Sequence, residues 1–269
     1  MERLLVLKLD AVACEAEAWL NGIAIARVDA ARPSAVVPVH EYTVAGVNRL
    51  ELVAWPRPAA GSAEEAAPPP TLRADGHMAA HLRILLPRAG NPADEASARC
   101  LAQLDWMPPA GEAFEAPLNR SLDLPLPVSF PRWRWLDAPP AEATPALAEQ
   151  ALALLSQLAR ALEEGNTEAF VSAVRLRTEE IATAYQLPPE QATESLRRHL
   201  AELCSAGPPA WLPLEPGGVF LRRLAGGRLF ECLDASGEPA LRTAADTRGQ
   251  AHVFPLRLAA VEGKLYVLR

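Results

Sequence analysis

The chain has 269 residues, of which 50% are hydrophobic and 22% charged. This composition excludes disorder along the whole chain, and the length fits two domains better than one. The formal net charge of −7 argues against a nucleic-acid-binding protein, because phosphate binding needs a clustered positive field.

The first residues, MERLLVLKLDAV, contain no basic segment followed by a long hydrophobic run, so no signal peptide is predicted. No window approaches the ~18 uninterrupted hydrophobic residues that a membrane-spanning helix needs. The four cysteines lie far apart and form no CxxC pair, which is typical of free buried thiols. These features predict a cytoplasmic protein that does not contact membranes.

Residues 1–137 are predicted to form an antiparallel β-sandwich. The clearest signal is EAEAWLNGIAIARV, in which Asn21 and Gly22 separate two alternating runs. Both residues tolerate the positive φ of a type I′ turn, so this segment is predicted to be a hairpin. The expected cross-strand pairs on its core face are Leu20 with Ile23 and Ala18 with Ile25.

Further strands are predicted in SAVVPVHEY, NRLELVAW, AAHLRILLP, ARCLAQLDW and SLDLPLPVSF. Short strands separated by Gly/Pro turns, without a long helix, are typical of a sandwich. In the second of these runs, Leu50, Leu52 and Ala54 are expected to face the core. The stretches 56–76 and 107–117 have the composition of extended, mobile loops.

The turn in EYTVAGVNRLEL precedes one of these strands. Gly46 permits a tight backbone, and the side-chain amide of Asn48 can hydrogen-bond to turn groups that would otherwise remain unpaired. The turn is therefore predicted to be an element of the fold rather than a binding site.

Residues 138–145 are predicted to be a Pro-rich linker, because the hydrophobic period changes there from 2 to 3.6. Residues 146–269 are predicted to form an α+β domain. Its helices are expected in ALAEQALALLSQLARALEEGN, TEAFVSAVRLRTEEIATAYQL and PPEQATESLRRHLAELCSAG. Strands are expected in GGVFLRRLAGG, GRLFECLDASGE, ALRTAADTRG, HVFPLRLAAVEG and KLYVLR.

The segments WLNGIAIARV and PVHEYTVAGVNRLELVAW are similar to the jelly-roll sugar-binding domains that accompany glycoside hydrolases. Leu20-Asn21-Gly22 matches the "LNG" hairpin of that family, and Gly46-Val47-Asn48-Arg49-Leu50 matches its "G-x-N-x-L" turn. The similarity covers roughly residues 10–55. It implies a jelly-roll-like sandwich and, more faintly, sugar binding.

The second half resembles the NTF2-like (SnoaL-like) fold in its element order, with helices followed by strands and a final hairpin from Leu258 to Arg269. The resemblance implies helices that pack on a curved antiparallel sheet. The family contains enzymes, dimerisation modules and binding domains without a universal catalytic motif. A homodimer through the sheet is therefore expected from the resemblance, and no catalytic residue is carried over.

The stretch FPRWRWLDAPP is the most unusual in composition. In an extended segment, Trp133 and Trp135 are expected on one face and Arg132 and Arg134 on the other. The two rings could stack on a sugar or on a hydrophobic patch of a partner. The favoured alternative is structural, with the rings packed in the sandwich core or between the two domains.

Five residues of the C-terminal strands could line a cavity if the sheet curves around one. A carboxylate with a raised pKa in such a pocket could serve as a general acid or base. The favoured alternative is a solvated sheet face with cross-strand ion pairs. The candidates are Arg222, Glu231, Asp234, Arg242 and His252.

His77 and His81 have the i,i+4 spacing of a zinc motif, but the glutamate of HExxH is absent and the context is that of a strand. No third ligand is near in sequence, so no metal site is predicted. The chain also contains no GxSxG, P-loop or GxGxxG motif, so no catalytic residue and no cofactor are predicted.

These observations favour a non-catalytic role in binding or assembly, with a protein partner or a second copy of the chain. One alternative is a carbohydrate-binding module, which requires exposed Trp133 or Trp135 rings. Another is an enzyme that binds a small molecule in a C-terminal pocket beside a group of perturbed pKa.

Overall fold

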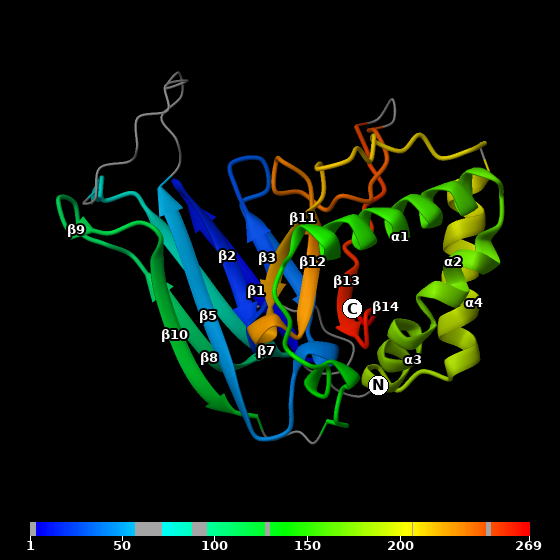
Figure 1. The fold of residues 1–269 in the computed structure, drawn as a ribbon. Coiled ribbons are helices and arrows are strands. Elements are labelled where there is room, and N and C mark those ends of the chain that lie inside the picture. Colours follow the sequence, from blue (N-terminus) through cyan, green and yellow to red (C-terminus); the bar gives the residue numbers. More distant parts are fainter. Residues whose placement is uncertain (1–3, 57–71, 88–95, 127–129, 206, 246–248) are drawn as a thin grey trace. The chain divides into compact units, whose positions relative to one another are not determined.

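The computed structural model describes residues 4–56, 72–87, 96–126, 130–205, 207–245 and 249–269. The chain forms two compact units, Met1–Pro131 and Arg132–Arg269. In the described residues, antiparallel sheets make up the first unit, and four α-helices followed by an antiparallel sheet make up the second (Figure 1). The division falls shortly before residue 137, where the sequence places the end of the first domain. Most of the loop predicted at 56–76 lies outside the described residues.

The first unit contains two four-stranded sheets with the orders β4-β1-β7-β8 and β10-β5-β2-β3. A third sheet consists of two strands, β6 and β9. Of these, β9 lies inside the predicted loop 107–117. The strands are β1 (Val6–Val12), β2 (Cys14–Leu20), β3 (Ile23–Val28), β4 (Ser34–Pro38), β5 (Val47–Pro56), β6 (Leu72–Arg73), β7 (Ala79–Leu86), β8 (Arg99–Trp106), β9 (Ala113–Phe114) and β10 (Leu118–Pro125).

Alternate residues of both four-stranded sheets share one hydrophobic core. Leu9 of β1 and Leu82 of β7 come from the first sheet, and both are fully buried. Leu50, Leu52 and Ala54 of β5 come from the second and are also fully buried, so their predicted orientation is confirmed. Each leucine removed from water in this way stabilises the fold by about 1.5–3 kcal/mol.

The hairpin between β2 and β3 has the predicted turn, with φ of 54° at Asn21 and 73° at Gly22. Leu20 pairs with Ile23 as predicted. The second predicted pair is wrong, because Ala18 pairs with Ala26 and not with Ile25. A β-bulge beside Ala18 shifts the register, since it places an extra residue on one of the two strands.

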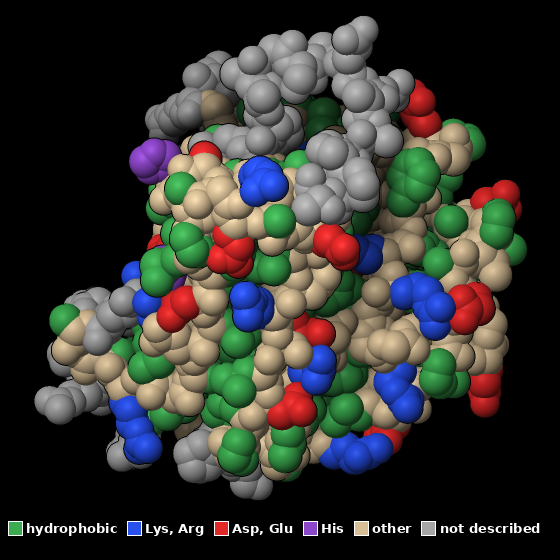
Figure 2. All heavy atoms as spheres, turned by 90° about the vertical axis from the view of Figure 1, so that its left-hand side faces the viewer, with side chains coloured by type: hydrophobic (Ala, Val, Ile, Leu, Met, Phe, Trp, Pro, Cys, Tyr) green, Lys and Arg blue, Asp and Glu red, His purple; other side chains and the backbone are tan. Residues whose placement is uncertain are grey.

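Charged side chains of both signs are interspersed on the face of the molecule shown in Figure 2. Ion pairs also cross the strands of the β10-β5-β2-β3 sheet: Arg27 lies 3.0 Å from Glu15, and Arg49 lies 3.3 Å from Asp123. A mixed surface of this kind produces no extended field of one sign.

In the second unit, four helices precede a sheet with the order β11-β12-β13-β14. The predicted second helix is divided at Val174, whose ψ of 11° departs from the helical value. The strand predicted in ALRTAADTRG, residues 240–249, is replaced in its described part by isolated β-bridges. The elements are α1 (Pro145–Glu163), α2 (Thr167–Ala173), α3 (Arg175–Ala184), α4 (Pro189–Cys204), β11 (Phe220–Leu224), β12 (Leu229–Leu233), β13 (Arg257–Val261) and β14 (Lys264–Val267).

Helices α1 and α2 begin at polar caps. The Thr144 side chain accepts a hydrogen bond from the backbone N–H of Leu147 at 3.2 Å, and the Asn166 side chain accepts one from Ala169 at 3.2 Å. Such caps satisfy N–H groups that have no partner within the helix. None of the helices in the described part of the chain is long and hydrophobic enough to cross a membrane.

The Pro-rich segment after residue 137 is hydrogen-bonded to the second unit. Arg228 donates to the carbonyl of Ala138 at 2.6 Å, and the N–H of Ala141 donates to the carbonyl of Gly227 at 2.9 Å. These bonds fix the start of the segment beside the turn that joins β11 and β12.

Candidate functional site

An open cleft with a volume of about 620 Å³ lies between α2, α3 and α4. This volume falls within the range of about 300–1,000 Å³ that is common for ligand pockets. Three helices contribute both hydrophobic and charged side chains to its lining. The lining residues are Glu168, Val171, Ser172, Arg175, Thr178, Glu179, Pro189, Glu190, Thr193, Glu194 and Arg197.

An ion pair across the cleft rim connects α4 to α2. The Nε and Nη2 atoms of Arg197 lie 2.6 and 3.0 Å from the two carboxylate oxygens of Glu168. Two parallel charge-assisted bonds of this kind orient both side chains. The hydrogen bonds from Arg197, assisted by its charge, lower the pKa of Glu168.

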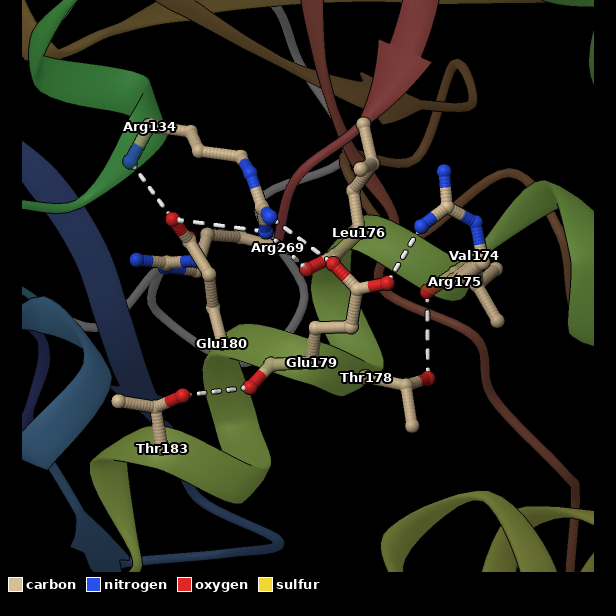
Figure 3. A network of polar contacts seen from close by, with 9 residues as sticks. All are labelled: Arg134, Val174, Arg175, Leu176, Thr178, Glu179, Glu180, Thr183 and Arg269. Carbon is tan, nitrogen blue, oxygen red and sulfur yellow. Dashed lines mark hydrogen bonds and ion pairs between the residues drawn. The ribbon is translucent and has the colours of Figure 1, made fainter. Parts of the chain in front are cut away.

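The α3 side of the cleft carries a second group of ion pairs. Glu179 accepts a hydrogen bond from Arg175 of the same helix, and it also lies 2.8 Å from the Nη2 atom of Arg134 (Figure 3). One carboxylate therefore binds two guanidinium groups, and its position on the cleft wall is fixed from two sides.

Behind this wall, Glu180 is buried and bonded through both carboxylate oxygens (Figure 3). One oxygen accepts the backbone N–H of Arg134 at 2.6 Å, and the other accepts a hydrogen bond from Arg269. The Arg269 guanidinium is also buried, and its central carbon lies 5.3 Å from the ring centre of Trp133. These contacts attach α3 to the segment 133–136 and to the end of the last strand, which holds the wall of the cleft in place.

The cleft has an excess of negative charge. Four carboxylates and two guanidinium groups line it, which gives a formal charge of −2. The carboxylates belong to Glu168, Glu179, Glu190 and Glu194. Such a lining attracts positively charged groups and repels phosphate.

The predicted candidates around Trp133 do not form an exposed platform. Trp133 and Trp135 are 1% and 2% exposed, so neither ring is accessible to a sugar. Arg132 lies 2.6 Å from Asp137, and this hydrogen bond lowers the pKa of the Asp137 carboxyl. Arg134 contributes to the network behind the cleft.

The five predicted pocket residues are not assembled into one site. Arg222 and Glu231 are paired across β11 and β12 at 2.6 Å. The Glu231 carboxylate also lies 3.4 Å from Arg257 of β13. Glu231 is buried, whereas the sequence analysis favoured a solvated sheet face. The ring of His252 lies elsewhere, 5.9 Å from that of His199.

The remaining two candidates, Asp234 and Arg242, form a separate ion pair at 2.5 Å. Burial by itself would raise the pKa of Asp234. Hydrogen bonds from Ser236, Arg242 and the Glu238 backbone outweigh this effect and lower the pKa to about 2. Asp234 therefore holds a turn together as an acceptor that stays charged at neutral pH.

A group of polar side chains on neighbouring strands of the β4-β1-β7-β8 sheet was not identified from the sequence. His81 of β7 lies 2.7 Å from Asp105 of β8, and its neighbour on β1 is Asp10. Asp10 in turn accepts a hydrogen bond from Ser34 of β4 at 2.6 Å. The sequence places His81 in a predicted strand, but it does not predict the register that brings His81 beside Asp10 and Asp105. Among the described residues, no three His, Cys, Asp or Glu side chains are close enough to hold a metal ion.

The cleft itself was also missed. Arg175 with Glu179, and Glu190 with Glu194, have helical i,i+4 spacing that is visible in the sequence. The spacing shows which side chains share a helix face, but it does not show that three helices meet there.

No protein-family model, curated protein or solved structure matches this chain. The similarities to jelly-roll domains and to the NTF2-like fold therefore rest on turn motifs and on the order of the elements.

Proposed function

We propose that this protein has a non-catalytic binding role, with the cleft between α2, α3 and α4 as its binding site. The observation that carries the proposal is the cleft itself, whose charged rim is positioned by ion pairs within and between helices. A rim that is ordered before binding reduces the entropy lost when a ligand binds.

The finer assignment of the fold belongs to the same proposal. Two four-stranded antiparallel sheets around one core support a jelly-roll-like β-sandwich for the first unit. Four helices followed by a sheet that ends in the β13–β14 hairpin support an NTF2-like second unit. A homodimer is expected from the resemblance to the NTF2-like fold, and light scattering at micromolar concentration tests it. A cytoplasmic location is expected from the sequence.

The two alternatives have less support. A carbohydrate-binding module would need an aromatic surface other than the Trp133 and Trp135 rings, since both are buried. An enzyme with a C-terminal pocket would need the predicted charged residues to converge, and instead they form separate ion pairs.

Capture of partners from the organism of origin tests the binding role. Ser172 is exposed on α2 and lines the cleft, so Ser172→Trp places a large ring in the cleft without disturbing the core. Gln157→Trp introduces the same ring at an exposed position of α1 outside the lining and serves as the matched control.

We expect the wild type and Gln157→Trp to capture the same partner and Ser172→Trp to lose it, with equal melting temperatures for all three proteins. Equal capture by all three would show that the cleft is not the binding site. Turnover of a substrate that requires cleft residues would replace the binding role with an enzymatic one.

A further inference from the structure

We propose that the cleft binds an extended basic segment of a partner protein, in which Arg or Lys side chains contact Glu190 and Glu194. This inference rests on the proposed binding role of the cleft and specifies its occupant.

The four carboxylates of the cleft differ in how far they are neutralised. Glu168 binds Arg197 through two short bonds, and Glu179 binds both Arg175 and Arg134. Glu168 and Glu179 are thus already paired with guanidinium groups of the same chain.

Glu190 and Glu194 are neutralised less than Glu168 and Glu179 are. Glu194 lies 3.8 Å from Arg197, near the limit of an ion pair, and its side chain is 67% exposed. Glu190 is exposed in the first turn of α4, and it forms no ion pair with any residue in the described part of the chain. These two exposed carboxylates are therefore the least neutralised in the cleft and the ones most available to an incoming cation.

The spacing of the two glutamates indicates the form of the ligand. Residues four apart share one helix face, with their Cβ atoms about 5–6 Å apart, and like charges at this spacing repel each other. Every second residue of an extended chain points the same way, at a repeat of about 6.6–6.8 Å. A segment with basic residues at alternate positions can therefore place one cation at each carboxylate and remove the repulsion.

The rest of the lining suits the long side chains of such a segment. Val171 and Pro189 provide hydrophobic surface between the charged groups. Lys and Arg commonly bury their hydrocarbon stems against such surfaces while the charged end binds a carboxylate.

Calorimetric titration with an acetylated and amidated hexapeptide of alternating Arg and Ser tests the inference. The cleft variant is Glu190→Gln/Glu194→Gln. The control is Glu149→Gln/Glu202→Gln, which changes the net charge equally at exposed helical positions outside the lining. A peptide with citrulline in place of Arg has the same size without the charge.

We expect the wild type and the control to bind the Arg peptide with affinities within about twofold of each other, and the cleft variant to bind it roughly tenfold more weakly. The citrulline peptide should bind none of the three proteins. Equal weakening in both double variants would show that the peptide responds to diffuse charge, and would overturn the inference.

Failure of this inference can be distinguished from failure of the proposed binding role. If the wild type does not bind the Arg peptide but Ser172→Trp still loses its natural partner, the cleft binds something other than a basic segment. If Ser172→Trp keeps all its partners, both proposals are wrong.

Discussion

Asn48 shows how one buried amide holds a turn together. Its Oδ1 atom accepts hydrogen bonds from the Val44 N–H and from the Asn21 amide, both at 2.8 Å, and its Nδ2 atom donates to the Val44 carbonyl at 2.9 Å. The sequence-based expectation that this amide pairs with turn groups is confirmed. Asn48→Ala should lower the free energy of unfolding by about 2–4 kcal/mol, because buried polar groups lose their partners.

Urea denaturation of Asn48→Ala beside Asn119→Ala measures this effect. Asn119 is exposed and makes a local hydrogen bond to the Pro117 carbonyl. Its replacement should change the free energy of unfolding by less than about 0.5 kcal/mol. Similar losses in the two variants would contradict the role given to Asn48.

The buried pair of Glu180 and Arg269 gives a second prediction at the residue scale. Glu180→Leu should destabilise the protein by about 3–5 kcal/mol, because Arg269 then remains buried without its carboxylate. The double variant Glu180→Leu/Arg269→Met should recover most of this loss, since it removes both charges. Denaturation of the single and double variants measures the coupling, and additive losses would show that the two residues act independently.

At the scale of elements, the turn between β11 and β12 explains why two consecutive glycines follow Ala225. Both have positive φ, 66° at Gly226 and 85° at Gly227. A Cβ atom on Gly227 would lie 2.6 Å from the Ala141 carbonyl oxygen, whereas one on Gly226 would meet no atom within 4 Å. The two positions therefore separate the effect of backbone conformation from the effect of close packing.

Gly226→Ala should lower the free energy of unfolding by about 1–2 kcal/mol, the cost of a left-handed conformation in a residue with a side chain. Gly227→Ala should lower it by about 2–4 kcal/mol, because the clash also displaces the segment 138–142. Thermal unfolding measures both. An equal effect at the two positions would show that this segment does not pack against the turn.

The positions of most helices and strands were predicted from the sequence, but their breaks, bulges and order were not. Three helical segments were predicted from their hydrophobic spacing, but the break at Val174 was not, because the spacing of Phe170, Val174 and Ile181 continues through it. Alternation predicted the buried face of β5. It did not predict the bulge beside Ala18 or the order β4-β1-β7-β8, because register and strand order depend on residues distant in sequence.

At the scale of the whole molecule, several carboxyl groups make stability depend on pH. Hydrogen bonds from nearby groups hold the pKa values of these carboxyls below their usual range, against the opposing effect of burial. A carboxyl whose pKa is lower in the folded protein stabilises the fold above its unfolded pKa, and this stability is lost as the pH falls through the folded value. The groups include Asp29, Asp105 and Asp234.

The free energy of unfolding should therefore decrease as the pH is lowered from about 5, roughly one unit above the usual Asp pKa of 3.8, to the pKa of about 2 for Asp234. Asp234→Asn should reduce this dependence, because it removes the group with the largest resolved shift among the carboxyls. Urea denaturation at several pH values in this range measures both slopes. An unchanged slope in the variant would contradict the role of Asp234.

The site was less accessible to sequence reasoning than the fold. The Trp and Arg residues of FPRWRWLDAPP attracted attention by composition, yet the two rings are buried and Arg134 supports the cleft from behind. The cleft is formed by residues of ordinary type on α2, α3 and α4, and only their convergence distinguishes them.

The central claim is that a partner occupies this cleft, and site-specific photo-crosslinking in the organism of origin tests it most directly. A photoreactive amino acid at position 172 should form a covalent adduct with one partner, whereas the same residue at position 157 should not. Absence of an adduct from position 172, or the same adducts from both positions, would contradict the binding role of the cleft.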